Sequence, residues 1–281
     1  MSQACPPSAC DSCQVARGNL EKLGLKLDRW DHVIALAGNP NTGKSTVFNR
    51  LTGLRQHTGN WPAKTSARAV GGFAFGGRRY KIVDLPGTYS LRSASPDETV
   101  AREFILFGRP DVTVVVVDAT CLERNLNLAL QILQITDRVV VCLNLMDEAR
   151  ANNLVVDPRG LAADLGVPVV PCAARSGEGI DRLLAEIDAV ATGAFQPRPY
   201  RLRLDVPGLR EAVDDIVRRL RAAYPDIAHA EWVALRLLEG DRAVADMVER
   251  GDIGRLAPDH AAAAQTPAAV PAGAAATGGG R

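Results

Sequence analysis

A glycine-rich run in the first fifth of the chain has residue types and a spacing that suit phosphate binding. Residues 38–45 read Gly-Asn-Pro-Asn-Thr-Gly-Lys-Ser and match G-x-x-x-x-G-K-[S/T]. Glycines let backbone N–H groups wrap a β-phosphate, Lys44 supplies positive charge to the β- and γ-phosphates, and Ser45 offers a hydroxyl to Mg²⁺. The strand-like segment before the run and the helical pattern after it argue against a chance turn. The predicted nucleotide contacts are Gly38, Asn39, Pro40, Asn41, Thr42, Gly43, Lys44, Ser45 and Thr46.

A carboxylate and a glycine follow at the end of a predicted strand. The sequence Asp84-Leu85-Pro86-Gly87 places Asp84 near Mg²⁺, through water, and the Gly87 amide near a γ-phosphate. D-x-x-G alone is weak, since an ordinary strand-end turn can contain these residues. Its place after the hairpin predicted from 69–75 and 79–84 makes it the expected second motif of a GTPase rather than an ATPase.

The sequence Asn144-Leu145-Met146-Asp147 selects the base. A carboxylate at Asp147 accepts from guanine N1 and N2 together, whereas adenine has no such pair of donors. Each hydrogen bond to a charged group contributes about 1.5–3 kcal/mol, so two suffice to prefer GTP over ATP. The loop Ala173-Ala174-Arg175 is predicted to stack on the base, with the Ala174 amide as donor to guanine O6. Because this loop departs from the usual Ser-Ala-Lys, we expect it to be more mobile and the affinity weaker.

A threonine between residues 56 and 65 must close over Mg²⁺ and the γ-phosphate. We predict Thr65, with Thr58 as the second choice, and a solvated loop threonine is the alternative for either. The predicted Mg²⁺ ligands are Ser45, Thr65 and Asp84.

The elements that position these residues form an alternating pattern. Short β-branched runs alternate with amphipathic stretches, which predicts an α/β fold of the P-loop GTPase type with a mainly parallel sheet, followed by a small all-α domain. A strong helix start is Ser95-Pro96-Asp97-Glu98, read as a capping box rather than as a pair of catalytic acids. Strands are expected at 33–37, 69–75, 79–84, 112–118, 138–144 and 167–172, and helices at 44–53, 96–107, 123–135, 157–165 and 179–191.

Composition shifts divide the chain into four predicted parts. Residues 31–195 form the G domain, 196–257 a helical bundle or hairpin, and 258–281 a disordered tail rich in Ala, Gly and Pro. The segment 1–30 contains Cys5, Cys10 and Cys13, which either bind a metal or act as a redox pair, or belong to a mobile reduced tail. Three further cysteines, Cys121, Cys142 and Cys172, are expected to be structural.

Charge and hydropathy exclude several classes of protein. The 281 residues are 47% hydrophobic and 23% charged with a net charge of +1, so no nucleic-acid partner is indicated. Apolar runs are only strand-length, far below the roughly 18 residues that span a bilayer. No basic segment followed by an apolar stretch opens the sequence, so we expect a soluble chain in the cytoplasm.

Together these motifs resemble the ferrous iron transport protein B family. The resemblance covers roughly residues 31–250. It includes the residues at 118–126, Trp232 and those at 237–241. It implies a cytoplasmic G domain and a helical GDI-like domain, joined in the full chain to a membrane domain that carries Fe²⁺ across the bacterial inner membrane. It leaves open the oligomeric state and whether the helical domain slows GDP release.

Thr88 follows Gly87, so no glutamine orients the attacking water and slow hydrolysis is expected. The resemblance implies activation by K⁺, held by Asn41 and by carbonyls near Gly59 and Trp61, although Asn41 is equally suited to a turn. Residues predicted to act in hydrolysis, or to contact nucleotide beyond the glycine-rich run, are Asn41, Lys44, Gly59, Trp61, Thr65, Asp84, Gly87, Asn144, Asp147, Ala173, Ala174 and Arg175.

Three functions remain open from these residues. The first is a GTP-dependent regulator of Fe²⁺ uptake, whose switch loops pass a change to the helical domain. The second is a ribosome-assembly-type GTPase, for which no basic RNA-binding appendage is visible. The third is a nucleotide sensor without meaningful turnover.

Overall fold

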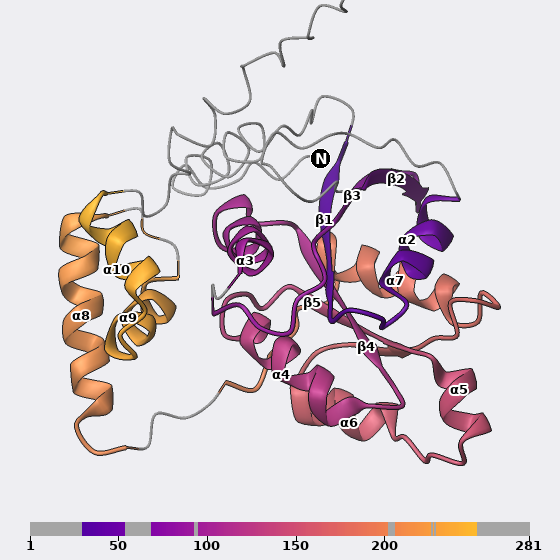
Figure 1. The fold of residues 1–281 in the computed structure, drawn as a ribbon. Coiled ribbons are helices and arrows are strands. Elements are labelled where there is room, and N and C mark those ends of the chain that lie inside the picture. Colours follow the sequence, from indigo (N-terminus) through magenta and orange to yellow (C-terminus); the bar gives the residue numbers. More distant parts are fainter. Residues whose placement is uncertain are drawn as a thin grey trace, which may run out of the picture.

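The computed structural model describes residues 30–53, 69–92, 95–201, 206–225, 227 and 229–251. Its centre is a six-stranded sheet with the order β2-β3-β1-β4-β5-β6, in which only β2 is antiparallel (Figure 1). The strands are β1 (His32–Gly38), β2 (Val70–Phe75), β3 (Arg78–Asp84), β4 (Val112–Asp118), β5 (Val139–Asn144) and β6 (Val169–Pro171). The central strand β1 therefore delivers the glycine-rich run to the carboxyl edge of the sheet, where parallel α/β folds bind ligands.

Helices cover both faces of the sheet, as its buried strands require. The helices that accompany the sheet are α2 (Lys44–Thr52), α3 (Pro96–Gly108), α4 (Leu122–Leu133), α5 (Met146–Ala151), α6 (Pro158–Leu165) and α7 (Ile180–Ala191). Phe48 of α2 and Leu183 of α7 belong to one apolar cluster. Phe104 of α3 and Leu128 of α4 belong to the cluster on the opposite face.

Three further helices follow the sheet unit: α8 (Leu209–Ala223), α9 (Ala230–Leu238) and α10 (Arg242–Glu249). Figure 1 shows them grouped beside α3 and α4, away from α2 and α7. Val213 and Trp232 are buried in the same apolar cluster as Phe104 of α3, so the helical unit shares a core with the sheet unit. Within the described residues, no helix combines the length and the apolar character needed to cross a bilayer.

The expected elements are present with small shifts of their ends, and one was missed. Helix α5 has six residues, too few to display a helical hydrophobic period. The N-cap of α3 is confirmed, since Ser95 Oγ accepts from the Glu98 amide at 3.2 Å. The Glu98 carboxylate accepts from Ser90 Oγ, also at 3.2 Å.

The cysteines divide by burial. Cys142 and Cys172 are fully buried, and their contact together with burial raises the pKa of the Cys142 thiol well above its usual value. Cys121 is exposed, so the expectation that it fills a structural position is wrong. Cys5, Cys10 and Cys13 lie outside the described residues, as do most of segment 1–30 and the tail 258–281.

Candidate nucleotide-binding site

The glycine-rich run connects β1 to α2 through a turn in which two glycines cannot be replaced without a clash. Gly43 has a φ of +79°, and a Cβ there would lie 2.3 Å from Asn144 Nδ2. A Cβ at Gly38 would lie 2.7 Å from the Val116 carbonyl oxygen. The packing thus requires glycine at both positions and leaves backbone N–H groups open at the start of α2.

A cavity of about 400 Å³ opens at this turn. Its lining contains eight residues, all but one from the glycine-rich run or the first turn of α2: Asn39, Pro40, Asn41, Gly43, Lys44, Ser45, Thr46 and Gly87. Gly87 enters from the loop after β3, and a Cβ there would contact Pro40 at 3.4 Å. The structure therefore brings the first two predicted motifs to one cavity.

Lys44, which lines this cavity, is paired with Asp84. Lys44 Nζ forms an ion pair with Asp84 Oδ1 and donates to the Leu85 carbonyl at 2.7 Å. Burial raises the pKa of Asp84, while the positive charge of Lys44 opposes the rise. A buried carboxylate at this position is stabilised by a cation.

The donor set suits Mg²⁺. Ser45 supplies a hydroxyl at the start of α2 and Asp84 a carboxylate at the end of β3, and hard oxygen ligands of this kind are those that Mg²⁺ prefers. Asp84, which pairs with Lys44 in this structure, would supply the negative charge to such an ion. The third predicted ligand, Thr65, lies outside the described residues together with Thr58, Gly59 and Trp61.

Thr88 holds the loop after Gly87 against the glycine-rich run. Its amide donates to the Gly38 carbonyl at 3.3 Å and its hydroxyl to the Ser90 carbonyl at 2.6 Å. The Thr88 side chain is buried. It is thus committed to the backbone, and it occupies the position after Gly87 at which Ras-like GTPases carry a water-orienting glutamine.

Asn144 links the glycine-rich run to the predicted base loop. Its Nδ2 donates to the Thr42 carbonyl at 2.9 Å, and its Oδ1 accepts from the Ala174 amide at 3.0 Å. The side chain is 1% exposed. Asp147 follows in the first turn of α5, at the same edge of the sheet. The third motif is therefore joined to the first through one buried amide side chain.

The Ala174 amide already has a partner in Asn144, so its predicted bond to guanine O6 would share or replace this contact.

A residue that sequence reasoning missed fixes the same loop. Arg50 of α2 donates from Nε to the Ala174 carbonyl at 2.9 Å and from Nη2 to the Arg175 carbonyl. These contacts oppose the mobility expected of the loop. No local signal could have revealed them, since 124 residues separate Arg50 from Ala174.

Asn41 projects from the turn with a φ of +67°. Asn is among the few non-glycine residues that favour this left-handed region, so the turn explanation accounts for the residue type. Asn41 also lines the cavity. Both interpretations of Asn41 therefore stay open.

The family model of ferrous iron transport protein B matches residues 32–187. The Fe(2+) transporter FeoB of Escherichia coli K12 is 40% identical over 212 residues, which are 74% of this chain and 27% of that protein. The FeoB transporter of Salmonella typhimurium is 41% identical over the same shares. The chain thus spans about a quarter of the length of these relatives.

Solved structures of FeoB cytosolic domains are also similar to this chain. The cytosolic domain of L. pneumophila FeoB has a TM-score of 0.70 at 33% identity, covering 77% of this chain and 85% of that one. A GDP form of the T. maritima FeoB cytosolic domain has a TM-score of 0.71 at 32% identity, covering 82% of this chain and 90% of that one. Ribosome assembly is not favoured by these matches. The chain belongs to the ferrous iron transport protein B family, and its six-stranded unit is the P-loop GTPase-type G domain of that family.

Proposed function

We propose that this chain is the GTP-hydrolysing cytoplasmic part of a longer bacterial transporter, in which it regulates Fe²⁺ uptake at the inner membrane. The names of the relatives support the transport role, which would belong to the whole protein, since the chain spans 27% of the Escherichia coli relative. The partner would be the membrane-embedded domain of the same longer chain. No nucleic acid is needed, and self-association is compatible with this role.

The observation that carries the nucleotide assignment is the Asn144 side chain. Its two hydrogen bonds, to the Thr42 carbonyl and from the Ala174 amide, fix the phosphate turn and the base loop relative to each other. Asp147 lies three residues further on, in the first turn of α5, and would accept from guanine N1 and N2. The base and the phosphates of one nucleotide would therefore meet a single rigid frame.

Hydrolysis would depend on charge and position. Lys44 would leave Asp84 for the β- and γ-phosphates, and the Gly87 amide would meet the γ-phosphate. Mg²⁺ bound by Ser45, Thr65 and Asp84 would neutralise charge on the phosphate oxygens. K⁺ bound by Asn41 and the carbonyls of Gly59 and Trp61 would do so near the β-γ bridge. Because Thr88, and not a water-orienting glutamine, follows Gly87, turnover would be slow.

A G domain at 31–195 and a GDI-like helical domain at 196–257 would be coupled through α3. Ser90, two residues after Thr88, donates to Glu98 in the first turn of α3. Four residues further along that helix, Arg102 pairs with Asp241 at the start of α10. A rearrangement after Gly87 would reach the helical domain by this route.

The assignment is tested by calorimetry with GTP, GDP and ATP. Wild type should bind both guanine nucleotides and prefer GTP over ATP by at least about 100-fold, because two charged hydrogen bonds are at stake. Asp147→Asn should lose GTP affinity and gain affinity for xanthosine triphosphate. Glu148→Gln removes an exposed carboxylate from the same turn and is the matched control.

Two outcomes would contradict the assignment. Equal affinities of wild type for GTP and ATP would reject Asn144 to Asp147 as the base-reading motif. An equal loss in Asp147→Asn and Glu148→Gln would mean that α5 contributes only general negative charge.

A further inference from the structure

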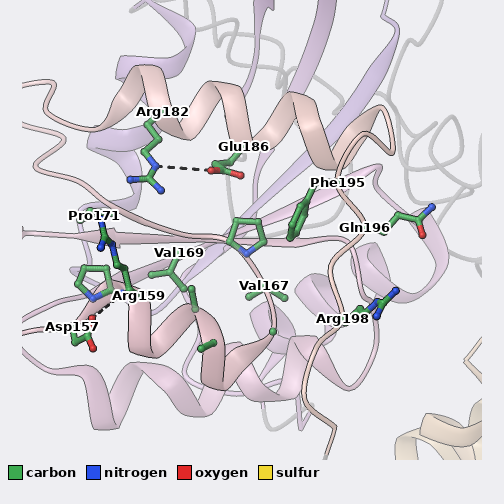
Figure 2. A pocket seen from close by; sticks show the side chains of 15 residues that line it. Asp157, Arg159, Val167, Val169, Pro171, Arg182, Glu186, Phe195, Gln196 and Arg198 are labelled. Carbon is green, nitrogen blue, oxygen red and sulfur yellow. Dashed lines mark hydrogen bonds and ion pairs between the residues drawn. The ribbon is translucent and has the colours of Figure 1, made fainter.

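A groove of about 840 Å³ lies at the edge of the sheet formed by β6. β6 is last in the strand order, and β5 is the only described strand with which it pairs. Figure 2 shows the groove between a helix above and a helix below, with the strand behind. One wall is α7, through Arg182 and Glu186. The other is α6 with its N-cap, through Asp157, Pro158, Arg159, Ala162 and Ala163.

The backbone of β6 offers a donor and an acceptor to this groove. Val141 N donates to the Pro168 carbonyl at 2.9 Å, and Cys172 N donates to the Leu143 carbonyl at 2.7 Å. In a parallel ladder alternate residues bond the same neighbour, so the N–H and C=O of Val169 point away from β5. Pro168 belongs to the set that faces β5, whereas Pro171 belongs to the outward set and has no N–H to donate. Within β6, Val169 is therefore the residue that offers an outward N–H to a partner strand.

The lining combines apolar side chains with three arginines and two carboxylates, Asp157 and Glu186. Val167, Val169 and Phe195 supply apolar surface, and Phe195 remains 45% exposed. Arg182 lies 3.9 Å from Glu186 of its own helix. The guanidinium groups of Arg159 and Arg198 make no hydrogen bond or ion pair within the described residues, and Figure 2 places them toward opposite ends of the groove.

We propose that this groove binds an extended, acidic segment of another polypeptide, which adds to the sheet beside β6. An added strand would use the outward N–H and C=O of Val169. Its side chains would alternate between the α6 wall and the α7 wall, because successive residues of a strand point to opposite faces. Carboxylates at its two ends would pair with Arg159 and Arg198 in the geometry that guanidinium favours.

Repulsion between arginines disfavours a second copy of this chain as the occupant of the groove. Symmetric pairing of two β6 edges is antiparallel, so it would bring Arg159 of one copy toward Arg198 of the other, and like charges across an interface are unfavourable. An acidic partner reverses that repulsion. The proposal concerns a surface other than the nucleotide cavity and does not depend on the proposed GTPase function.

The probe is a phage-displayed library of linear 12-residue peptides, selected on the 281-residue chain. Arg159→Glu/Arg198→Glu serves for counter-selection, and Arg218→Glu/Arg219→Glu on α8 makes the same change of charge at exposed positions away from the groove. We expect enriched peptides with acidic residues and alternating β-branched residues. Their affinity should fall at least about tenfold in the groove variant and stay unchanged in the α8 variant.

Hydrogen exchange supplies a second measurement on unmodified protein. A selected peptide should slow exchange of the Val169 amide, which an added strand would bond directly. The proposal is overturned if no peptide is enriched, if affinity is equal in both double variants, or if Val169 exchange is unchanged by bound peptide. Dimerisation of the chain that the groove variant abolishes would also overturn it, because the occupant would then be a second copy.

Discussion

Arg102 of α3 and Asp241 at the start of α10 form an ion pair that joins the sheet unit to the helical unit. Arg102 Nη1 lies 3.6 Å from Asp241 Oδ2, and the arginine side chain is 1% exposed. Asp241 also caps α10, since its Oδ1 accepts from the Val244 amide at 3.2 Å. A fully buried cation at a contact between two units is costly unless its counter-charge stays in place, so this pair favours one arrangement of the two units.

Asp241→Asn should destabilise the protein strongly. Asparagine keeps a good N-cap for α10 but removes the charge opposite Arg102, and an uncompensated buried charge costs about 3–5 kcal/mol. Urea unfolding measures the change. Asp215→Asn breaks exposed pairs with Arg218 and Arg219 and should cost less than about 1 kcal/mol. Similar losses in both variants would contradict a structural role for the Arg102 pair.

The contrast between these residues shows what the sequence could predict. The placement of the phosphate turn, Asp84 and Asn144 to Asp147 was predictable because each lies at the carboxyl end of a strand, and parallel strands bring these ends to one edge. Arg102 and Arg50 were not, because their partners are 139 and 124 positions away and neither interrupts a helical pattern. Local periodicity carries no signal of such long-range polar contacts.

Arg50 should control how long nucleotide stays bound. Arg50→Met keeps most of the side-chain volume but removes the donors that hold the Ala174 and Arg175 carbonyls. Losing hydrogen bonds from a charged donor costs about 1.5–3 kcal/mol, which corresponds to release roughly 10- to 150-fold faster. Stopped-flow release of a fluorescent GDP analogue tests this. Arg219→Met on α8 is the control, and equal release rates in the two variants would argue that the base loop does not need Arg50.

His229 should make stability depend on pH. Burial first, then the charges of Arg109 and Arg201, lowers the pKa of His229 from 6.5 to about 4, against the opposing effects of Asp137 and the Ile135 carbonyl. The unfolded chain therefore binds more protons between these values, and stability should fall as pH drops from 6.5 to 4 and stay level above 6.5. The full loss is of the order of 3 kcal/mol.

His229→Asn isolates this contribution. Asparagine tolerates the left-handed φ of +57° at this position and does not titrate. Subtracting the variant's unfolding free energy from that of wild type at each pH cancels the carboxylates common to both proteins. A difference that does not change between pH 4 and 6.5 would show that His229 has an ordinary pKa in the folded protein.

GTP hydrolysis should be faster in KCl than in NaCl at equal ionic strength. Phosphoryl transfer develops charge near the β-γ bridge, where a supplied arginine finger contributes about 10³- to 10⁵-fold in other GTPases. No such arginine lines the cavity among the described residues, whereas Asn41 does. A K⁺ ion held by the Asn41 side-chain oxygen would place positive charge there, and the smaller Na⁺ would fit the same ligands poorly. We expect a preference for K⁺ of at least about tenfold, below the effect of an arginine finger.

Removing the Asn41 side chain should erase that preference while sparing GDP binding. Asn41→Ala strains a backbone with a φ of +67°, so Asn41→Gly, which accepts this conformation without cost, separates loss of the ligand from distortion of the turn. Single-turnover hydrolysis in the two salts, with GDP affinity measured alongside, distinguishes these effects. If both variants keep the wild-type ratio of rates, Asn41 is a turn residue only. If wild type itself shows equal rates in KCl and NaCl, the monovalent-ion mechanism fails for this chain and another source of positive charge has to act at the β-γ bridge.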